Sequence, residues 1–225
     1  MGSIALPPFA GLIRPKVAAA GGITLVEAGH VDMVVNSGVF TFVETLQEDD
    51  IVIVHIAADS SGIGAPTPAT YTKRFDNGSF GIAAECWYKF MGATPDTTMT
   101  LAGSGNKETA IVTVWRGVDT TTPFDVSDTS ANSGSGLPNS PSLTTVTAGA
   151  MRVISGFLDD DLAVFTAPSG YTLADTWNLD ESIYRQSVCV AYAPAPTAGA
   201  DNPAVFGADT GNDSWYAYHQ ALRPA

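Results

Sequence analysis

The sequence predicts an all-β protein, an antiparallel two-sheet sandwich of the jelly-roll type with an extended N-terminal arm. Helix formers never gather into a long amphipathic run, whereas the 225 residues include 22 glycines, 14 prolines and many threonines. Short apolar runs with strand-like patterning, such as residues 39–43 and 51–58, recur between turn-forming residues. Segments of the second half also resemble segments of the first, as an internal duplication would produce.

Residues 1–30 are predicted to form the extended arm, and residues 31–225 a single sandwich domain. Proline-rich and glycine-rich steps in residues 1–22 suit an extended chain. The arm carries more apolar side chains than a free tail should expose, namely Ile4, Leu6, Phe9, Leu12 and Ile13. We therefore expect the arm to dock on the domain or on a neighbouring chain, the alternative being a partly ordered leader.

The strands of the first half are expected at residues 39–43, 51–58, 71–75, 80–91, 97–101 and 108–118. Residues 51–58 and 108–118 carry apolar side chains on both faces, which indicates strands in the middle of a sheet. The dipeptide Asn77-Gly78 is a strong signal for a hairpin turn. Residues 128–141 are too polar to be buried, so they should form the longest loop and the seam between the halves.

Pseudo-repeats are expected at about residues 39–126 and 150–225. The segment 68–72 (PATYT) matches 168–172 (PSGYT), and residues 51–58 match 151–158, both at an offset of 100. Residues 108–118 match 213–223 at an offset of 105. Loop insertions between copies of one unit would produce such a growing offset. Each copy has one apolar face that it cannot bury alone, so the copies should pack face to face or interleave in one sandwich.

Two matches in the aromatic strands conflict with each other. Aligning Cys86 with Cys189 needs an offset of 103, whereas aligning Tyr88 with Tyr192 needs 104. A slip of one residue turns every side chain to the other face of a sheet. If the tyrosines correspond, Tyr192 faces the core and Cys189 does not, which argues against a disulfide. Two cysteines in so long a chain also favour free thiols and a reducing compartment.

The net charge of −13 comes from 23 acidic and 10 basic residues. Nucleic-acid binding is not expected, because it relies on clustered lysine and arginine, and the basic residues here are scattered. The simpler interpretation of the charge is an acidic surface that favours solubility and does not indicate a binding partner. Neither a signal peptide nor a membrane-spanning run is present, so we expect a protein made in the cytoplasm.

No motif for catalysis, nucleotide binding or a metal site stands out, so no cofactor, no metal and no enzymatic activity are predicted. His55 and His219 lie in apolar strands, where hydrogen-bonded core imidazoles are expected. The acidic runs 48–50 and 159–161 are candidate calcium sites, because calcium prefers carboxylates on loops. Acidic turns at strand ends are ordinary, however, and we favour that interpretation.

Aromatic residues offer a candidate partner surface. Trp177 lies in a loop-rich stretch, and Trp215, Tyr216 and Tyr218 share the last strand. Alternation places Tyr216 and Tyr218 on one face and Trp215 on the other, so one of these sets should lie outside the core. Exposed aromatic rings on a β-sandwich are a usual platform for sugar rings or partner proteins. Trp177 and Trp215 are therefore candidate partner-binding residues.

The strand 108–118 ends in Arg116-Gly117-Val118-Asp119, followed by a proline-locked exit at 122–126 (TPFDV). The simplest interpretation of Arg116 and Asp119 is a local pair that stabilises the turn.

The order of these segments resembles a family of β-sandwich structural proteins from tailed bacteriophages and their prophages. The segments are an acidic turn, IVIVHIAADSSG, PATYT, an aromatic strand with WYKF, and AIVTVWRGVD with TPFDV, within residues 39–126. In that family a P-x-G-W-T segment precedes the aromatic strand. Here Thr70 and Tyr71 replace its glycine and tryptophan, although Gly170-Tyr171 in the second half is nearer.

The resemblance implies a virion component, with positions that range from head decoration to tail-fibre or tail-tip modules. An acidic sandwich with an apolar arm and no fibre shaft fits a capsid decoration or cement protein, bound to the major capsid protein or other virion proteins as a homo-oligomer. Two alternatives stay open. One is a tail-associated module that binds a surface glycan or receptor through Trp177 or Trp215. The other is a glycan hydrolase, which needs two carboxylates at a set separation.

Overall fold

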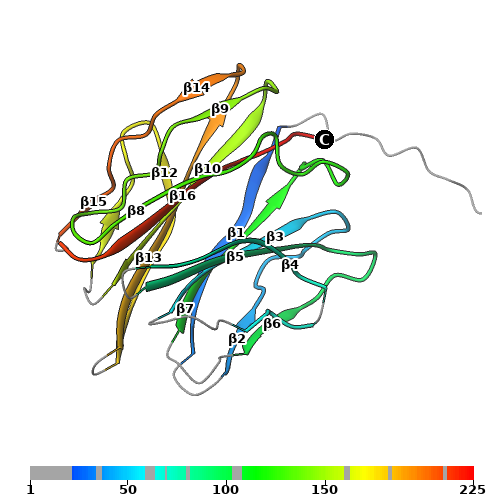
Figure 1. The fold of residues 1–225 in the computed structure, drawn as a ribbon. Helices are drawn as coiled ribbons and strands as arrows, with labels where there is room; N and C mark the ends of the chain where they lie inside the picture. Colours follow the sequence, from blue (N-terminus) through cyan, green and yellow to red (C-terminus); the bar gives the residue numbers. More distant parts are fainter. Residues whose placement is uncertain are drawn as a thin grey trace, which may run out of the picture.

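The computed structural model describes residues 22–33, 37–58, 64–68, 70–79, 82–102, 108–159, 163–181, 184–209 and 212–225. Within these residues the fold is all-β, as predicted, and its centre is a pair of five-stranded antiparallel sheets stacked face to face (Figure 1). The first sheet has the order β1 (Thr24–Met33), β7 (Glu108–Arg116), β3 (Ile51–Ala58), β5 (Ile82–Phe90), β4 (Thr72–Ser79). The second has the order β12 (Thr172–Glu181), β13 (Tyr184–Ala195), β10 (Ala150–Asp159), β16 (Trp215–Leu222), β8 (Thr129–Ser133).

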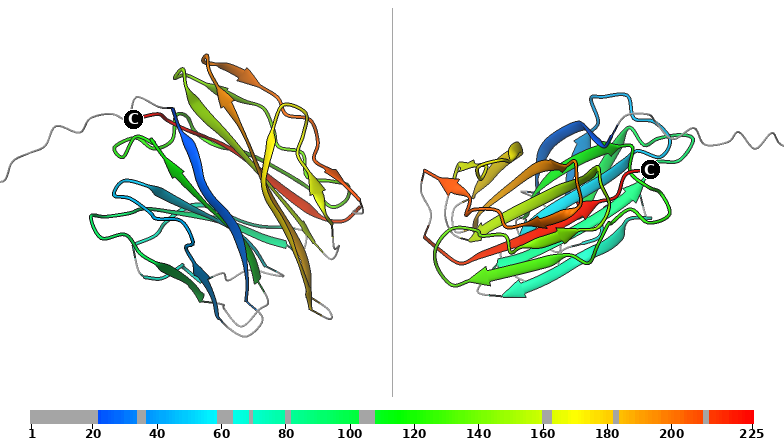
Figure 2. Two further views of the ribbon diagram at one scale, coloured as in Figure 1. Left: turned by 180° about the vertical axis from the view of Figure 1, so that it is seen from behind. Right: turned by 90° about the horizontal axis from the view of Figure 1, so that it is seen from above.

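Three two-stranded sheets cover the outer faces of this sandwich. One joins β2 (Ser37–Thr41) with β6 (Thr98–Ala102), over the first sheet. The other two join β9 (Leu143–Thr145) with β14 (Gly199–Asp201) and β11 (Phe165–Thr166) with β15 (Gly207–Ala208), in the second half of the chain. Strand colours run from blue to green in one large sheet and from green to red in the other (Figures 1 and 2), so each sheet is built from one half of the chain.

The two halves share one topology. In each half the edge strand β1 or β8 comes first and pairs with the last strand, β7 or β16. That last strand pairs with β3 or β10, which pairs with β5 or β13, and β4 or β12 closes the order. The equivalence extends to backbone irregularities, because β4 has a register shift between Lys73 and Phe75, and β12 has one between Leu173 and Asp175. Two such units therefore pack face to face, which is one of the two arrangements expected from the sequence.

The strand registers decide between the conflicting alignments. Ile53 pairs with Tyr88 in the first sheet, and Val153 pairs with Tyr192 in the second, so the tyrosines occupy equivalent positions. Cys86 then faces the space between the large sheets, whereas Cys189 faces the outer side of its sheet. Both thiols are buried and free.

The match of residues 108–118 to 213–223 was out of register by two residues. Ile51 pairs with Trp115, whereas Met151 pairs with Leu222, so the offset between β7 and β16 is 107 when that between β3 and β10 is 100. An even error leaves every side chain on the correct face, which is why the pattern of apolar residues did not reveal it.

Three apolar clusters form the core. The largest lies between the two large sheets and includes Trp115, Phe157 and Tyr216. A second lies between the first sheet and the β2–β6 layer, and a third lies on the outer face of the second sheet. Strands β3 and β16 are consequently buried along their whole length, and β7 and β10 almost so. This explains why residues 51–58 are apolar on both faces, since a strand covered on both sides has no solvent-facing positions.

Three sequence expectations about boundaries were wrong. Strand β1 begins at Thr24 and pairs with β7, so residues 24–30 belong to the sheet and not to the arm. Asn77 and Gly78 are not a turn, because β4 continues through them to Ser79, which pairs with Ile82. The polar segment 128–141 contains β8, an edge strand whose exposed side explains its polar composition.

Candidate functional site

The segment that follows β7 joins the two halves of the molecule. Gly117 has a φ of 86°, a left-handed conformation that favours glycine, and it turns the chain out of the sheet. The segment then runs beside the C-terminal residues. The amide of Asp119 donates to the carbonyl of Arg223 at 2.9 Å, and the amide of Arg223 donates to the carbonyl of Pro123 at 2.9 Å. The C-terminus therefore lies beside this segment and the start of β1 (Figures 1 and 2).

Arg116 and Asp119 have separate partners. Asp119 stabilises its own turn, because its carboxylate accepts the amides of Thr121 at 2.7 Å and Thr122 at 2.9 Å. Arg116 instead donates through Nε and Nη2 to the carboxylate of Asp50, at 2.8 and 2.7 Å. The expected local Arg116–Asp119 pair is therefore wrong for Arg116. This bidentate bond raises the pKa of the Arg116 guanidinium and ties the end of β7 to the start of β3.

Asp125 anchors the same segment to the second half. Its carboxylate accepts the amides of Val146 at 2.6 Å and Thr147 at 3.1 Å, and Arg223 lies within 3.4 Å. Burial alone would raise the pKa of Asp125, but these hydrogen bonds lower it below the ordinary value. Arg116 and Asp125 thus join elements of the scaffold, and Asp119 stabilises a turn.

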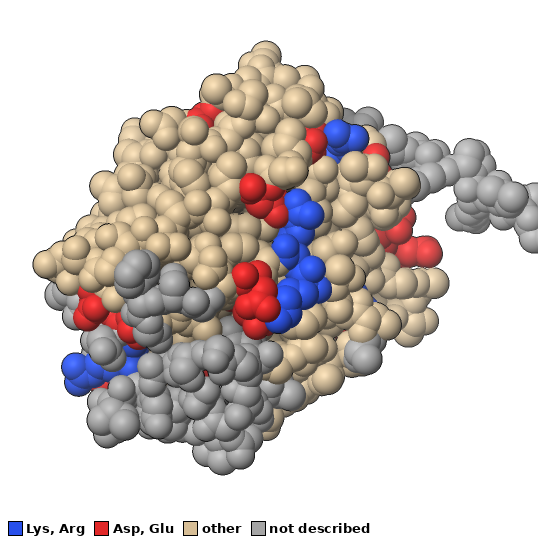
Figure 3. Space-filling model, viewed as in Figure 1, with Lys and Arg blue, Asp and Glu red and all other residues tan. Residues whose placement is uncertain are grey.

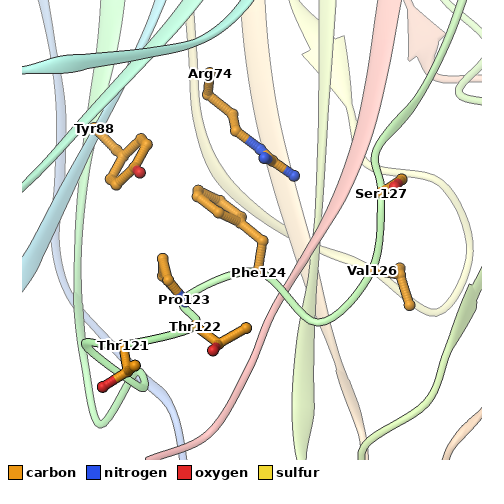
Figure 4. A pocket seen from close by; sticks show the side chains of 8 residues that line it. All are labelled: Arg74, Tyr88, Thr121, Thr122, Pro123, Phe124, Val126 and Ser127. Atoms are coloured by element: carbon orange, nitrogen blue, oxygen red, sulfur yellow. The ribbon is translucent and has the colours of Figure 1, made fainter.

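A shallow pocket of about 340 Å³ opens beside this segment (Figure 4). The guanidinium of Arg74 lies over the ring of Phe124, 4.1 Å from its centre, and the ring of Tyr88 meets Phe124 edge-on with centres 5.1 Å apart. Thr121, Pro123 and the neighbouring residues complete the wall. The pocket joins β4 and β5 to the linking segment, so it lies on the boundary between the two halves.

Behind the pocket, Asp128 holds two side chains from different sheets. Its carboxylate lies 2.6 Å from Nε of Arg74 and accepts a short hydrogen bond from the hydroxyl of Tyr218. Burial raises the pKa of Asp128 in spite of Arg74, and burial likewise raises the pKa of Tyr218. Both contacts are made to Oδ2, whereas Oδ1 of Asp128 is buried without a hydrogen-bond partner.

The opposite edge of the sandwich carries a second polar cluster, between β1 and β12. The rings of His30 and Trp177 are stacked with centres 3.5 Å apart and an interplanar angle of 9°. Nδ1 of His30 lies 3.0 Å from Asp175, and the indole N–H of Trp177 donates to Asp32 at 2.9 Å. This cluster joins the two sheets and leaves the side chain of His30 about one third exposed.

We expect His30→Ala to reduce the free energy of unfolding by about 1–2 kcal/mol, through loss of the stack and of the contact with Asp175. His30→Phe keeps an aromatic ring and should recover part of this loss. Urea denaturation at pH 7 measures both variants. A His30→Ala variant as stable as the parent would show that the cluster contributes nothing to the joint between β1 and β12.

The candidate partner-binding residues differ in how far they are buried. Trp177 is half-buried and one face of its ring is covered by His30. Trp215 is only 9% exposed and its indole N–H donates to the carbonyl of Ser135 at 3.0 Å. Tyr216 and Tyr218 are each 1% exposed, so the expectation that one of the two aromatic sets lies outside the core is wrong. The first sheet covers the face of β16 that carries Tyr216 and Tyr218, and the outer layer covers the face that carries Trp215. Ile4, Leu6, Phe9, Leu12 and Ile13 lie outside the described residues.

The two strand histidines differ in their hydrogen bonding. His219 is buried, with Nδ1 2.9 Å from the carbonyl of Pro141 and Nε2 3.4 Å from the hydroxyl of Tyr171, as predicted for a core imidazole. His55 is also fully buried, but neither ring nitrogen has a hydrogen-bond partner, so that prediction was wrong. Burial lowers the pKa of His55 to about 3. The imidazole is therefore neutral and serves as core volume.

Metal-binding chemistry finds no support in the part of the chain that the structure describes. No group of three histidine, cysteine, aspartate or glutamate side chains there could hold a metal ion. In the acidic run 48–50, Asp50 is committed to Arg116. In the run 159–161, Asp160 and Asp161 lie outside the described residues.

All seven lysine and arginine residues within the described ranges lie near a carboxylate: Lys73, Arg74, Lys89, Arg116, Arg152, Arg185 and Arg223. On the face shown in Figure 3, basic atoms form a short stripe with acidic atoms beside it. The cations of the described residues are thus already near anions, which disfavours binding of a phosphate backbone.

Comparisons with known proteins identify no relative. No family model matches the chain, and neither a curated protein nor a solved structure matches it. Among the described residues no helix is long and apolar enough to cross a membrane.

Proposed function

We propose that the chain is a non-enzymatic structural protein of a bacteriophage virion, namely a capsid decoration protein that binds the assembled head through its N-terminal arm and the edges of its sandwich. The observation that carries this proposal is that the residues on which the resemblance to the phage family rests have structural roles. Arg116 bonds Asp50, Asp119 caps its turn, and Asp125 holds residues 146–147. The motif thus stabilises the fold, and a structural role for the whole chain is consistent with this.

The packing of the body supports a structural role. Three apolar clusters hold its layers together, and the linking segment ties the C-terminus to the middle of the chain. The lysine and arginine residues of the described body all lie near carboxylates, as Arg116 does near Asp50 and Arg74 near Asp128. A binding surface must then come from the arm and the edges, because protein interfaces need accessible apolar anchors or unpaired strands.

The alternative function, a tail-associated module that binds glycans, needs exposed aromatic faces. Trp215 is buried, and His30 covers one face of Trp177. These two residues therefore do not build an open stacking platform, and we place the capsid role first.

Locating the protein in particles of the phage that encodes it tests the proposal. We expect antibody-gold label on the heads of purified particles, and loss of that label when residues 1–20 are deleted from the encoded protein. The truncated protein should still fold, as a circular dichroism spectrum of the purified variant would establish. Label at the tail tip would favour the alternative, and absence from the particles would overturn both virion roles.

A further inference from the structure

A second pocket, of about 310 Å³, lies on the outer side of the first sheet, next to the turn that leads into β3. Phe42, Leu46 and Pro95 supply its apolar wall, and Thr45 and Thr97 are also part of it. Phe42 and Leu46 are each 8% exposed, so the wall is part of the packed body. Val43, next to the pocket in sequence, is 86% exposed and extends the apolar surface outward.

The rim of this pocket is acidic. Glu44 and Asp96 line it, and Glu44 is exposed. Glu27 lies close by, since its carboxylate accepts the amides of Val43 at 3.0 Å and Glu44 at 3.2 Å. Lys89 neutralises Asp96 at 2.5 Å but does not itself line the pocket. The pocket therefore combines an apolar floor with a net negative rim, which suits a segment that is both apolar and cationic.

The N-terminal segment of this chain has that composition. Residues 1–21 contain no acidic residue and two basic ones, Arg14 and Lys16, besides the five apolar residues of the predicted arm. The rest of the chain carries all 23 acidic residues. Every basic residue of the described body is already near a carboxylate, and the segment holds two of the chain's three other basic residues, the third being Lys107.

The segment also leaves the body beside the pocket. The described chain begins at Gly22, and Thr24 pairs with Arg116 in the first sheet. Nη2 of Arg116 in turn lies 3.4 Å from the carbonyl of Thr45, a residue of the pocket wall. The six peptide links from Lys16 to Gly22 can span about 20 Å when extended. Tethering so close to a site gives an effective concentration on the order of millimolar.

We propose that this pocket binds residues 4–16 of the chain's own N-terminal segment, with Arg14 and Lys16 at the acidic rim. The segment of the same chain is favoured over that of a second copy because two strongly acidic bodies repel each other, whereas the tether costs little. The docking itself does not depend on the proposed function. One consequence rests on that function: before assembly the decoration protein keeps its N-terminal anchor bound to its own body, and binding to the capsid must release the anchor.

Photo-crosslinking of the full-length protein tests the docking. Benzoylphenylalanine replaces Phe9, the protein is irradiated, and the crosslinked peptides are located by mass spectrometry. We expect crosslinks to residues 42–46 and 95–97 in a product with the mass of one chain. Glu44→Lys should reduce their yield about fivefold, because it reverses a charge on the rim. Asp180→Lys, which reverses an exposed charge on β12, should leave the yield unchanged.

Three results would overturn the proposal: no crosslink, crosslinks to other surfaces, or crosslinks found only in a product with the mass of two chains. Thermal melts of both lysine variants show whether each remains folded. The experiment uses isolated protein, so its outcome is independent of where the protein lies in a particle. If docking is confirmed but head label is absent, the capsid role fails and the pocket assignment stands.

Discussion

Lowering the pH from 6.5 to 4.5 should cost the folded protein about 2.5 kcal/mol through His55 alone. Its pKa in the folded state is about 3, because the ring is fully buried and neither nitrogen has a partner. The unfolded chain has an ordinary histidine pKa near 6.5. Between pH 6.5 and 3, His55 is therefore protonated in the unfolded state and neutral in the folded state. The contribution to stability is therefore complete well above pH 6.5 and is lost as the pH drops, by about 4 kcal/mol when pH 3 is reached.

Urea denaturation of the parent protein, His55→Leu and His55→Gln between pH 7.5 and 4.5 checks this result. Both variants lack the titrating ring, so each should lose about 2.5 kcal/mol less than the parent over this range. At pH 7.5 His55→Leu should equal or exceed the parent in stability, since it removes two unsatisfied nitrogens, whereas His55→Gln keeps a buried polar group. Parallel pH profiles for all three proteins would mean that His55 is hydrated or paired in solution.

Arg116→Ala should reduce the free energy of unfolding by about 3 kcal/mol. The substitution leaves the carboxylate of Asp50, which is 1% exposed, without either of its guanidinium bonds. Removing one partner of a buried pair is costly because the remaining charge stays desolvated. Arg116 is itself about one third exposed, which places the effect at the lower end of the range for buried pairs.

Arg185→Ala is the matched control, because Arg185 also pairs with an aspartate, Asp180, but both side chains are about half exposed. It should cost less than about 0.5 kcal/mol. Adding Asp50→Asn to Arg116→Ala should restore about 1 kcal/mol by removing the buried charge. Equal losses for Arg116→Ala and Arg185→Ala in urea titrations would show that burial of Asp50 does not matter.

The sequence predicted the strand content well where burial is uniform. Residues 51–58 and 108–118 have apolar side chains on both faces, and both are central strands covered on two sides. It failed where a local signal was overridden. Asn77-Gly78 favours a turn, but pairing with β5 continues past it. Alternation along β16 predicts that either Trp215 or the pair Tyr216 and Tyr218 lies outside the core, yet both sides of the strand are covered.

The sequence by itself determined the all-β class, the doubled pattern of strands and the free cysteines, because these follow from side-chain periodicity and from spacing along the chain. The tertiary structure alone decided which residues meet. Arg116 finds Asp50 and not Asp119, His30 stacks on Trp177, and His55 is left without a partner. The Arg116–Asp50 bond depends on β7 and β3 being neighbours in the first sheet. The surroundings of His30 and His55 depend on how two sheets from different halves of the chain are stacked, and no pattern within either half records that alignment.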